Sequence, residues 1–317
     1  MRCHSAWTLV WSQVTVLDRS PRSSRKGEIW ESEPQFAAMP PNAKLLWPLF
    51  LLLDISIKLR IRTSYIVGFL TGVTQLHGTV YVIRDYFSGV LRFNATTRQQ
   101  LKDINVKHLS RPTDIVACEQ TSQVYVADRE CVWRMSADGE DTKRFVPKSP
   151  SDKLNPKTLS VTSTRLLVTS HDTKELMQYD AEGNELRRIQ LEADMKPEHA
   201  VESPSRTYIV SHEKTQLGQH QVSEVNADGK VLRHFGGSRL SSLGQSPYIA
   251  VDTHGNIFVA EHESRHILVL DAQLKFRRVV IDEHQLNYQP HRLCYREQSG
   301  LLVGFHLGAA VYDVLRH

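Results

Sequence analysis

Residues 247–271 read PYIAVDTHGNIFVAEHESRHILVLD, and this stretch decides the fold. A proline opens it, an apolar segment follows at 248–251, and a polar turn around His254-Gly255 separates this segment from two further apolar runs at 257–259 and 267–270. Short runs of β-branched and aromatic residues bounded by turn residues indicate strands. The stretch is therefore predicted to form three consecutive β-strands.

The same unit recurs along the chain. Its opening prolines are spaced by 44, 41, 50 and 43 residues and are Pro112, Pro156, Pro197, Pro247 and Pro290. An apolar first strand follows each proline, and a β-rich second strand follows a short turn, as in Val124-Tyr125-Val126. Val80-Tyr81-Val82 supplies a sixth copy of the second strand upstream. A period in this range is typical of a repeat architecture.

Most repeats continue into a third strand, a tight turn and a basic outer strand. Gly139, Gly183 and Gly229 lie in these turns, where glycine permits the positive φ that tight turns demand. The outer strands carry Lys143-Arg144, Arg187-Arg188, Arg233-His234 and Arg277-Arg278. Charged side chains of this kind protect an exposed sheet edge from pairing with another chain. Four strands in about 44 residues are typical of a β-propeller blade.

The last repeat has no fourth strand of its own, because His317 follows the third strand closely. Upstream, residues 55–62 (ISIKLRIR) alternate between apolar and polar side chains, as a half-buried strand does. We expect this strand to close the ring. The prediction is an all-β fold, a six-bladed β-propeller of four-stranded antiparallel blades over residues 55–317, preceded by a non-propeller N-terminal arm at 1–54.

The N-terminal arm differs in composition from the repeats. Four of the five tryptophans lie in it, and residues 45–53 (LLWPLFLLL) form an apolar run. A spanning helix needs about 20 apolar residues, so a membrane span is not expected. If translation began at Met39, the run would suit a signal peptide. The arm is expected to be poorly ordered, with a signal or anchor through 45–57 as the alternative; the cytoplasm is favoured over secretion.

Residues 247–271 resemble an NHL repeat, in which a proline, an apolar strand, Asp, Gly-Asn, a second apolar strand, Ala-Asp and Asn-x-Arg-Ile follow one another. The resemblance is also good over residues 111–135, whereas the other repeats share only the strand pattern. His266 stands where the repeat has Arg, Ser264 where it has Asn, and Glu261 where it has Asp. The chain is thus similar to the NHL-repeat six-bladed propellers of the TolB-like superfamily.

This resemblance implies several functions. NHL propellers bind RNA or proteins beside tripartite-motif ubiquitin-ligase domains, and six-bladed relatives include lactonases and a zinc-dependent peptide-amidating lyase. The four cysteines lack the tight spacing of a RING or B-box zinc module. We expect a non-catalytic binding or scaffold module for a protein or peptide, without a cofactor. The alternatives are an RNA-binding propeller without ligase domains and a metal-dependent lactonase or lyase.

The distribution of charge gives no support to nucleic-acid binding. The net charge of +4 comes from residues 1–70, because residues 71–317 hold 30 Lys and Arg against 30 Asp and Glu. Affinity for nucleic acid rests on clustered basic charge. The basic outer strands are therefore interpreted as edge protection, and RNA stays the alternative partner.

Three histidines occupy equivalent positions, three residues after the valine that ends a second strand. They are His171, His262 and His306. Three imidazoles on one face suit zinc with an open fourth position, but we expect these connections to lie too far from the propeller axis to converge, so no metal site is predicted. Asp114 and Asp252 flank first strands, where a side chain can reach the axis. Asn94 lies in a glycosylation triplet that matters only in a secreted chain.

The long connections indicate the binding face. In an up-and-down blade the links from second to third strand and from fourth to first strand emerge on one face, and these links are long and polar at 147–155, 211–221 and 236–246. Long loops on a rigid scaffold often carry recognition. We expect this face to bind a protein or peptide through Lys214, Gln216, His220, Arg239 and Tyr248, with Arg and Tyr as anchors.

Overall fold

The computed structural model describes one unit of the chain. The chain divides after Leu52, and every described residue follows that point: the backbone of 57–62, and residues 69–147, 154–237, 243–244, 247–286, 288–296, 300–305 and 308–312. Over these residues there is no helix long and apolar enough to cross a membrane. The predicted N-terminal arm, 1–54, lies outside the described residues.

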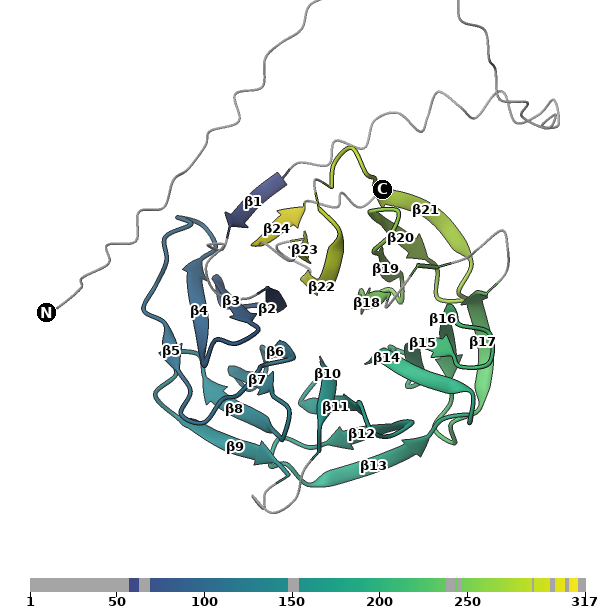
Figure 1. The fold of residues 1–317 in the computed structure, drawn as a ribbon, viewed down its shortest axis with the longest axis horizontal. Coiled ribbons are helices and arrows are strands. Elements are labelled where there is room, and N and C mark those ends of the chain that lie inside the picture. Colours follow the sequence, from purple (N-terminus) through teal and green to yellow (C-terminus); the bar gives the residue numbers. More distant parts are fainter. Residues whose placement is uncertain are drawn as a thin grey trace, which may run out of the picture. The chain divides into compact units, whose positions relative to one another are not determined.

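The described residues form six four-stranded antiparallel sheets arranged as a ring (Figure 1). This is the six-bladed propeller predicted from the sequence. Blade one contains β2 (Leu70–Leu76), β3 (Thr79–Arg84), β4 (Gly89–Asn94) and β5 (Ile104–Asn105); blade two, β6 (Asp114–Cys118), β7 (Gln123–Ala127), β8 (Val132–Ser136) and β9 (Thr142–Val146); blade three, β10 (Pro156–Thr162), β11 (Arg165–Ser170), β12 (Glu175–Tyr179) and β13 (Glu185–Gln190); blade four, β14 (Met195–Glu202), β15 (Tyr208–Lys214), β16 (Gln219–Val225) and β17 (Val231–Gly236); blade five, β18 (Tyr248–Val251), β19 (Ile257–Glu261), β20 (His266–Leu270) and β21 (Phe276–Ile281); blade six, β22 (Pro290–Arg296), β23 (Gly300–Phe305), β24 (Gly308–Tyr312) and β1 (Ile57–Arg62).

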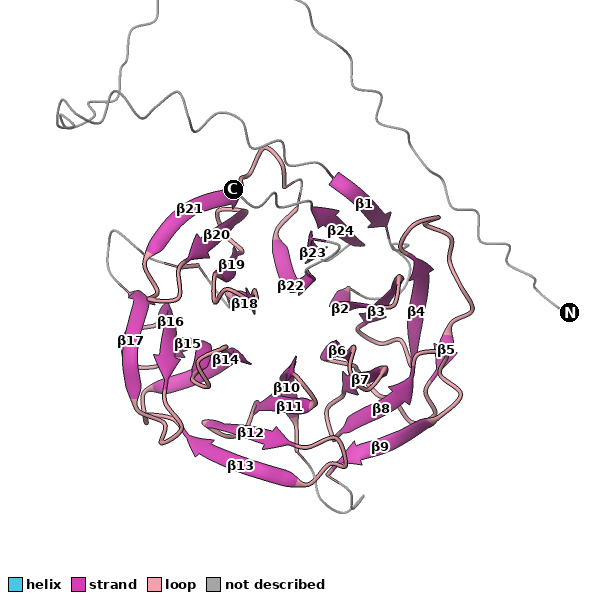
Figure 2. Ribbon diagram, turned by 180° about the vertical axis from the view of Figure 1, so that it is seen from behind, coloured by secondary structure: helices cyan, strands magenta, loops and turns pink. Residues whose placement is uncertain are grey.

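Blade six takes its strands from distant parts of the chain. β1 pairs antiparallel with β24, in a register that places Ile61 opposite Ala309 and Arg62 opposite Gly308. The strand expected at 55–62 thus lies at Ile57–Arg62 and forms the outer edge of the last blade (Figure 2). Without it, the backbone of β24 would be an unpaired edge.

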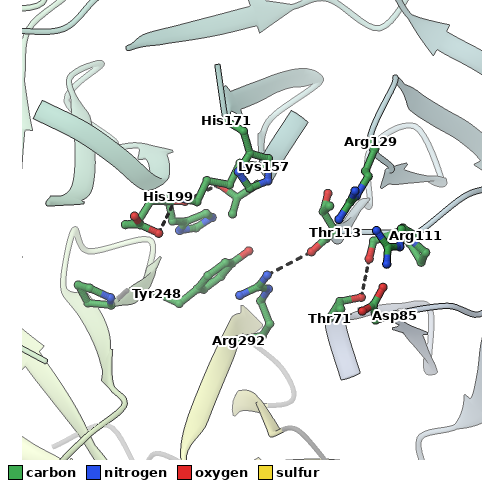
Figure 3. Close-up of a pocket in the computed structure, with 14 residues that line it drawn as sticks. Thr71, Asp85, Arg111, Thr113, Arg129, Lys157, His171, His199, Tyr248 and Arg292 are labelled. Carbon is green, nitrogen blue, oxygen red and sulfur yellow. Dashed lines mark hydrogen bonds and ion pairs between the residues drawn. The ribbon is translucent and has the colours of Figure 1, made fainter. Parts of the chain in front are cut away.

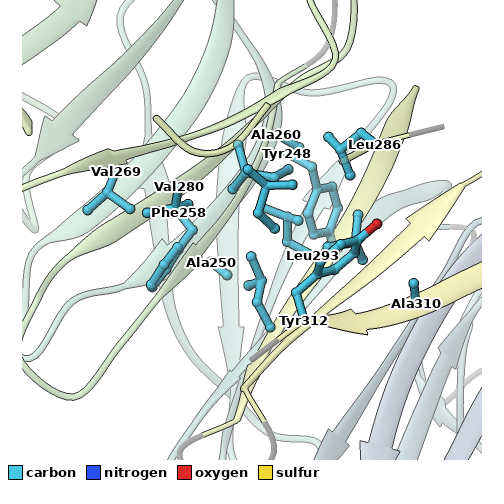
Figure 4. Packing of buried hydrophobic residues seen from close by; sticks show 14 of the residues in the cluster. Tyr248, Ala250, Phe258, Ala260, Val269, Val280, Leu286, Leu293, Ala310 and Tyr312 are labelled. Carbon is cyan, nitrogen blue, oxygen red and sulfur yellow. The ribbon is translucent and has the colours of Figure 1, made fainter. Parts of the chain in front are cut away.

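Burial follows the position of a strand in its blade. The central strand β19 is buried at every residue, whereas the outer strand β13 is exposed at all but Ile189. The buried side chains pack between adjacent blades, as in the cluster of blades five and six that includes Phe258, Leu293 and Tyr312 (Figure 4). Each large apolar side chain so buried contributes about 1.5–3 kcal/mol, and the ring is held together by these layers.

One glycine turn shows how closely adjacent blades approach. Gly229, between β16 and β17, has φ +83°, and a Cβ on it would lie 1.8 Å from the carbonyl oxygen of Gln190 in blade three. Both the positive φ and the contact therefore demand glycine. Gly139 and Gly183 adopt the same conformation in their turns, with φ +84° and +83°.

Hydrogen bonds near the axis join blade one to blade two, blade two to blade three, and blade three to blade four. The hydroxyl of Thr71 donates to the carbonyl of Pro112 at 2.8 Å, and that of Thr113 donates to the carbonyl of Pro156 at 3.1 Å. Thr158 continues the series by donating to the carbonyl of Glu198 at 3.0 Å. These repeated bonds fix the starts of the inner strands, which surround the candidate site.

Candidate functional site

A pocket of about 390 Å³ lies at the axis, on the face where second and third strands are connected. All six blades contribute to it, mainly through two positions of the repeat (Figure 3). The first position is the start of the inner strand, and the second is the residue just after the second strand. The lining residues at these positions are Thr71, Thr113, Lys157, Thr158, Glu198, His199, Tyr248 and Arg292, and Asp85, Arg129 and His171.

Asp114 does not line the pocket itself but bonds to residues that form its floor. Its side chain is 1% exposed. Its Oδ2 accepts hydrogen bonds from the Tyr248 hydroxyl at 2.9 Å and from the backbone N–H of Leu159 at 2.8 Å. Its Oδ1 accepts from the N–H of Ile115 at 3.0 Å. One carboxylate thus ties together blades two, three and five.

Burial shifts the pKa values of both Asp114 and Tyr248. Removal from water raises the pKa of Asp114, although Arg292 and the three hydrogen bonds lower it in part. Burial, and then the negative charge of Asp114, raise the pKa of Tyr248 well above its ordinary value. Tyr248 therefore stays a neutral donor to Asp114 at physiological pH.

Arg292 spans the floor from blade six. Its Nη2 donates to the carbonyl of Thr113 at 3.1 Å, and its Nη1 donates to the carbonyl of His291 at 3.0 Å. Its Nε lies 3.5 Å from Oδ1 of Asp114. The guanidinium also lies over the ring of Tyr248, 4.8 Å from the centroid. Its charge is thus engaged on several sides by the protein itself.

His199 completes the floor from blade four. Its ring stacks on Tyr248 with a centroid distance of 3.7 Å and an interplanar angle of 17°. Its Nε2 lies 3.2 Å from the carbonyl oxygen of Leu159, and a neutral ring with the proton on Nε2 donates there. Burial lowers the pKa of His199 to about 3, so the ring is neutral at physiological pH.

The wall of blades three and four contains an ion pair. Nζ of Lys157 lies 2.6 Å from Oε2 of Glu198, and both side chains are largely buried. His171 stands beside Lys157 (Figure 3). Partial burial, and then the positive charge of Lys157, lower the pKa of His171. This wall is therefore balanced in charge.

The wall of blades one and two has a different character. Arg111 donates from Nη2 to the Tyr86 hydroxyl at 2.5 Å, and its guanidinium lies 4.5 Å from the centroid of the Tyr86 ring. Arg129 is exposed and reaches the pocket from the end of β7. Among the residues that the structure describes, neither guanidinium lies within ion-pair distance of a carboxylate.

The floor separates this pocket from a smaller one. The second pocket, of about 120 Å³, shares His199 and Tyr248 with the first and continues along the inner strands past Ile115, Leu159 and Leu293. The layer of stacked and hydrogen-bonded side chains thus closes the axis between the two pockets.

The predicted binding residues occupy different places. Tyr248 lines the pocket but is 5% exposed, so it forms floor rather than a protruding anchor. Lys214 ends β15 and pairs with Asp194 at 3.2 Å. Gln216 is exposed in the turn between β15 and β16, and His220 is half-buried. Neither they nor Lys214 line this pocket. Arg239 lies outside the described residues.

The three aligned histidines are only partly described. His171 lines the pocket, whereas the ring of His262 contacts that of His291 at 4.5 Å, and His306 lies outside the described residues. Across the described part of the chain, no group of three or more His, Cys, Asp or Glu side chains is arranged to hold a metal ion. Asn94 is half-buried at the end of β4, where its Oδ1 accepts from the backbone of Thr96 and Thr97.

The equivalent position after the second strand reaches the pocket in three blades. Asp85, Arg129 and His171, each three residues after the second-strand valine, all line it, and the expectation that His171, His262 and His306 do not converge at ligand distance stays a prediction.

Sequence reasoning missed most of the floor and walls, although a signal was present. The prolines that define the repeat directly precede first-strand residues that line the pocket: Thr113 follows Pro112, Lys157 follows Pro156, and Glu198 and His199 follow Pro197. The two residues after each repeat proline could therefore have been selected as candidates.

Comparisons with known proteins support the fold. No family model matches the sequence, and a search of curated proteins found no significant match. Solved structures do match. A protein of unknown function from Bacteroides thetaiotaomicron has a TM-score of 0.61 at 13% identity, over 82% of this chain and 75% of that one.

Two other solved structures are enzymes by name. Virginiamycin B lyase from Staphylococcus aureus has a TM-score of 0.57 at 9% identity, over 83% of this chain and 100% of that one. Hydrazine synthase from Kuenenia stuttgartiensis has a TM-score of 0.57 at 10% identity, over 80% of this chain and 98% of that one. At such low identity the likeness shows the propeller fold alone, and membership of the NHL family stays a prediction.

Proposed function

We propose that this chain is a non-catalytic binding module that recognises a protein or peptide on the face containing the axial pocket. The observation that carries the proposal is a pocket of about 390 Å³ over a floor whose charged and polar groups are already bonded within the protein. Open, concave sites with a few fixed polar groups are where ligands bind. A rigid floor lowers the cost of ordering the site on binding.

The state of the floor residues supports binding rather than catalysis. A general acid or base needs access to the substrate and a pKa near the working pH. Asp114 is buried with both carboxylate oxygens accepting hydrogen bonds. His199 has a pKa of about 3 and its Nε2 is engaged with Leu159. These groups hold the pocket in shape and are not free to exchange protons with a ligand.

The alternative of RNA binding would use the arginines of the outer strands. Several of these arginines are paired with carboxylates: Arg188 with Glu175 and Glu185, Arg233 with Glu224, and Arg277 with Asp271. A carboxylate beside each guanidinium repels phosphate and weakens the counterion release that drives nucleic-acid binding. The pairs support a protective role for these edges.

Selection from a library of random peptides displayed on beads tests the proposal. We expect the full chain to select peptides that bind saturably, and His171→Trp, which places a bulky ring on the pocket wall, to weaken that binding. His234→Trp makes the same exchange on the exposed outer strand β17 and serves as the matched control. Peptide binding that falls with His234→Trp and not with His171→Trp would contradict the assignment of the face.

Two further measurements separate the alternatives. Binding of a random RNA pool at low salt, lost on Arg187→Glu with Arg233→Glu, would favour the RNA reading. Stoichiometric metal in the gently purified protein would favour the metal-dependent lyase or lactonase, an alternative that the lyase among the similar folds keeps in view. The binding proposal predicts neither result.

A further inference from the structure

We infer that the pocket anchors its ligand through a carboxylate, an Asp or Glu side chain of the bound peptide, held by Arg129 and Arg111 on the wall of blades one and two. This inference rests on the proposed function, since it names the chemistry of the peptide that the pocket would take. It starts from an imbalance of charge between the two walls.

The cations of the other wall and of the floor are already neutralised. Lys157 is paired with Glu198 at 2.6 Å, and Arg292 is bound to two backbone carbonyls and lies beside Asp114. An incoming anion would have to displace these partners. Neither group therefore offers a free positive charge to a ligand.

Within the described part of the chain, Arg129 and Arg111 face the pocket without a neutralising partner. Arg129 is exposed, and over the described residues no carboxylate lies within ion-pair distance of it or of Arg111. Arg111 is held by the hydroxyl and the ring face of Tyr86, which orient the guanidinium without cancelling its charge. A pre-oriented guanidinium loses less freedom when it binds.

The acidic groups around this wall decide where the anion would lie. Asp85 also lines the pocket, and its Oδ1 accepts from the N–H of Tyr86. This single carboxylate leaves the two guanidinium groups with an excess of positive charge. Arg129 also lines another pocket, of about 500 Å³, together with Glu130 and Asp172, and Asp172 accepts from Asn155. These acids would repel an anion there. The favourable position is therefore on the axial side of Arg129.

The chemistry of the two groups selects a carboxylate. A guanidinium presents its N–H groups as a planar fork that matches the two oxygens of a carboxylate, and such charge-assisted hydrogen bonds are stronger than neutral ones. A partly desolvated pocket wall strengthens the contact further. One such contact is expected to change the affinity by about tenfold or more.

The test is a double-mutant cycle on the selected peptides. Peptides from the random library are sequenced, and the tightest binder is also made with each Glu or Asp replaced by Gln or Asn. Both forms are titrated by fluorescence anisotropy against the wild type, Arg129→Gln, Arg111→Gln and the control Arg187→Gln, which removes an exposed arginine from the outer strand β13. Thermal unfolding verifies that each variant is folded.

We expect acidic residues to be enriched at one position of the selected peptides. Replacing that acid, or introducing Arg129→Gln or Arg111→Gln, should each weaken binding about tenfold, and the replaced peptide should bind these variants no more weakly than it binds the wild type. Arg187→Gln should leave every affinity unchanged.

Two other outcomes overturn different claims. Saturable binding of peptides that are not enriched in acidic residues would overturn the carboxylate inference and leave the binding proposal standing. The same holds if the loss of affinity from the peptide substitution and the loss from the arginine substitution are additive. Failure of the wild-type chain to select any saturable peptide would overturn the binding proposal itself.

Discussion

The inner and outer strands of the propeller use the same charged residues in different ways. Near the axis, Asp114 and Arg292 are 1% and 22% exposed at their side chains and are bonded to groups from other blades. On the rim, Arg188 is 46% exposed and pairs with Glu175 and Glu185 of its own blade. The inner charges join blades together, whereas the outer charges stay within one blade.

This difference shows that the place of a charge in the blade sets its contribution to stability. A buried carboxylate that loses its partners, or that leaves its donors unpaired, carries a large desolvation cost. An exposed ion pair is screened by water and salt and contributes little. We therefore expect substitutions near the axis to cost much more than those on the rim, while the rim contributes mainly through its backbone.

The largest effect on stability is expected from deleting β1, whose backbone pairs with β24 at the rim. A chain lacking residues 1–64 loses β1, which leaves the edge of β24 unpaired, whereas a chain lacking residues 1–50 retains this strand. The shorter chain should lose cooperative thermal unfolding, and the longer one should melt like the full chain. Equal melting temperatures for the two chains would show that the ring does not depend on β1.

Asp114→Ala should have the next largest effect. It leaves the Tyr248 hydroxyl and the Leu159 N–H without their acceptor and removes the carboxylate beside Arg292, so we expect the free energy of unfolding to fall by about 3–5 kcal/mol. Asp141→Ala is the matched control on the rim, since Asp141 forms an exposed pair with Lys143. It should cost less than about 1 kcal/mol. Denaturant unfolding measures both, and equal costs would contradict the comparison.

A buried histidine of blade four makes the free energy of unfolding depend on pH, and we expect this effect to be of intermediate size. His212 on β15 contacts the Ser223 hydroxyl at 2.8 Å, and burial lowers its pKa to about 4. Below its ordinary pKa of about 6.5 the unfolded chain takes up a proton that the folded chain does not, so this group costs stability as pH falls from about 7 to 4.

Between pH 7 and pH 5 this penalty amounts to about 2 kcal/mol. His212→Gln should remove it, so the unfolding free energy of the variant should fall less over this interval than that of the wild type. Denaturant titrations at the two pH values check this. The same decrease in both proteins would show that His212 does not take part.

Arg188→Ala is expected to have the smallest effect. The guanidinium pairs with two carboxylates, yet all three groups are partly exposed. We expect a loss of less than about 1 kcal/mol, reduced further by added salt. A loss close to that of Asp114→Ala would mean that the rim charges carry the structure as much as the inner ones do.

The fold was largely predictable from the sequence because it depends on local patterns. The prolines, the alternation of the strands and the turn glycines each repeat within the chain, and the strand expected at 55–62 is observed at Ile57–Arg62. These signals rest on the geometry of single blades, which neighbouring residues set. Blade count and strand order follow from them.

The candidate site was much less predictable, because it forms across the ring. Tyr248 and Asp114 are 134 residues apart in sequence, and Arg292 donates to a carbonyl 179 residues away. The repeat placed these residues at the inner strands, but which side chains meet depends on the packing of all six blades. That no carboxylate among the described residues pairs with Arg129 likewise depends on the packing of several blades.

Mapping where a selected peptide contacts the protein tests most directly whether the axial pocket is the binding site. A peptide with a photoreactive benzophenone group is cross-linked to the full chain, and the modified residues are identified by mass spectrometry. We predict cross-links at residues 111–113, 129, 157 and 171, around the axial pocket. Cross-links confined to the outer strands at 187–188, 233–234 and 277–278 would show that the rim binds the ligand and would contradict the central claim.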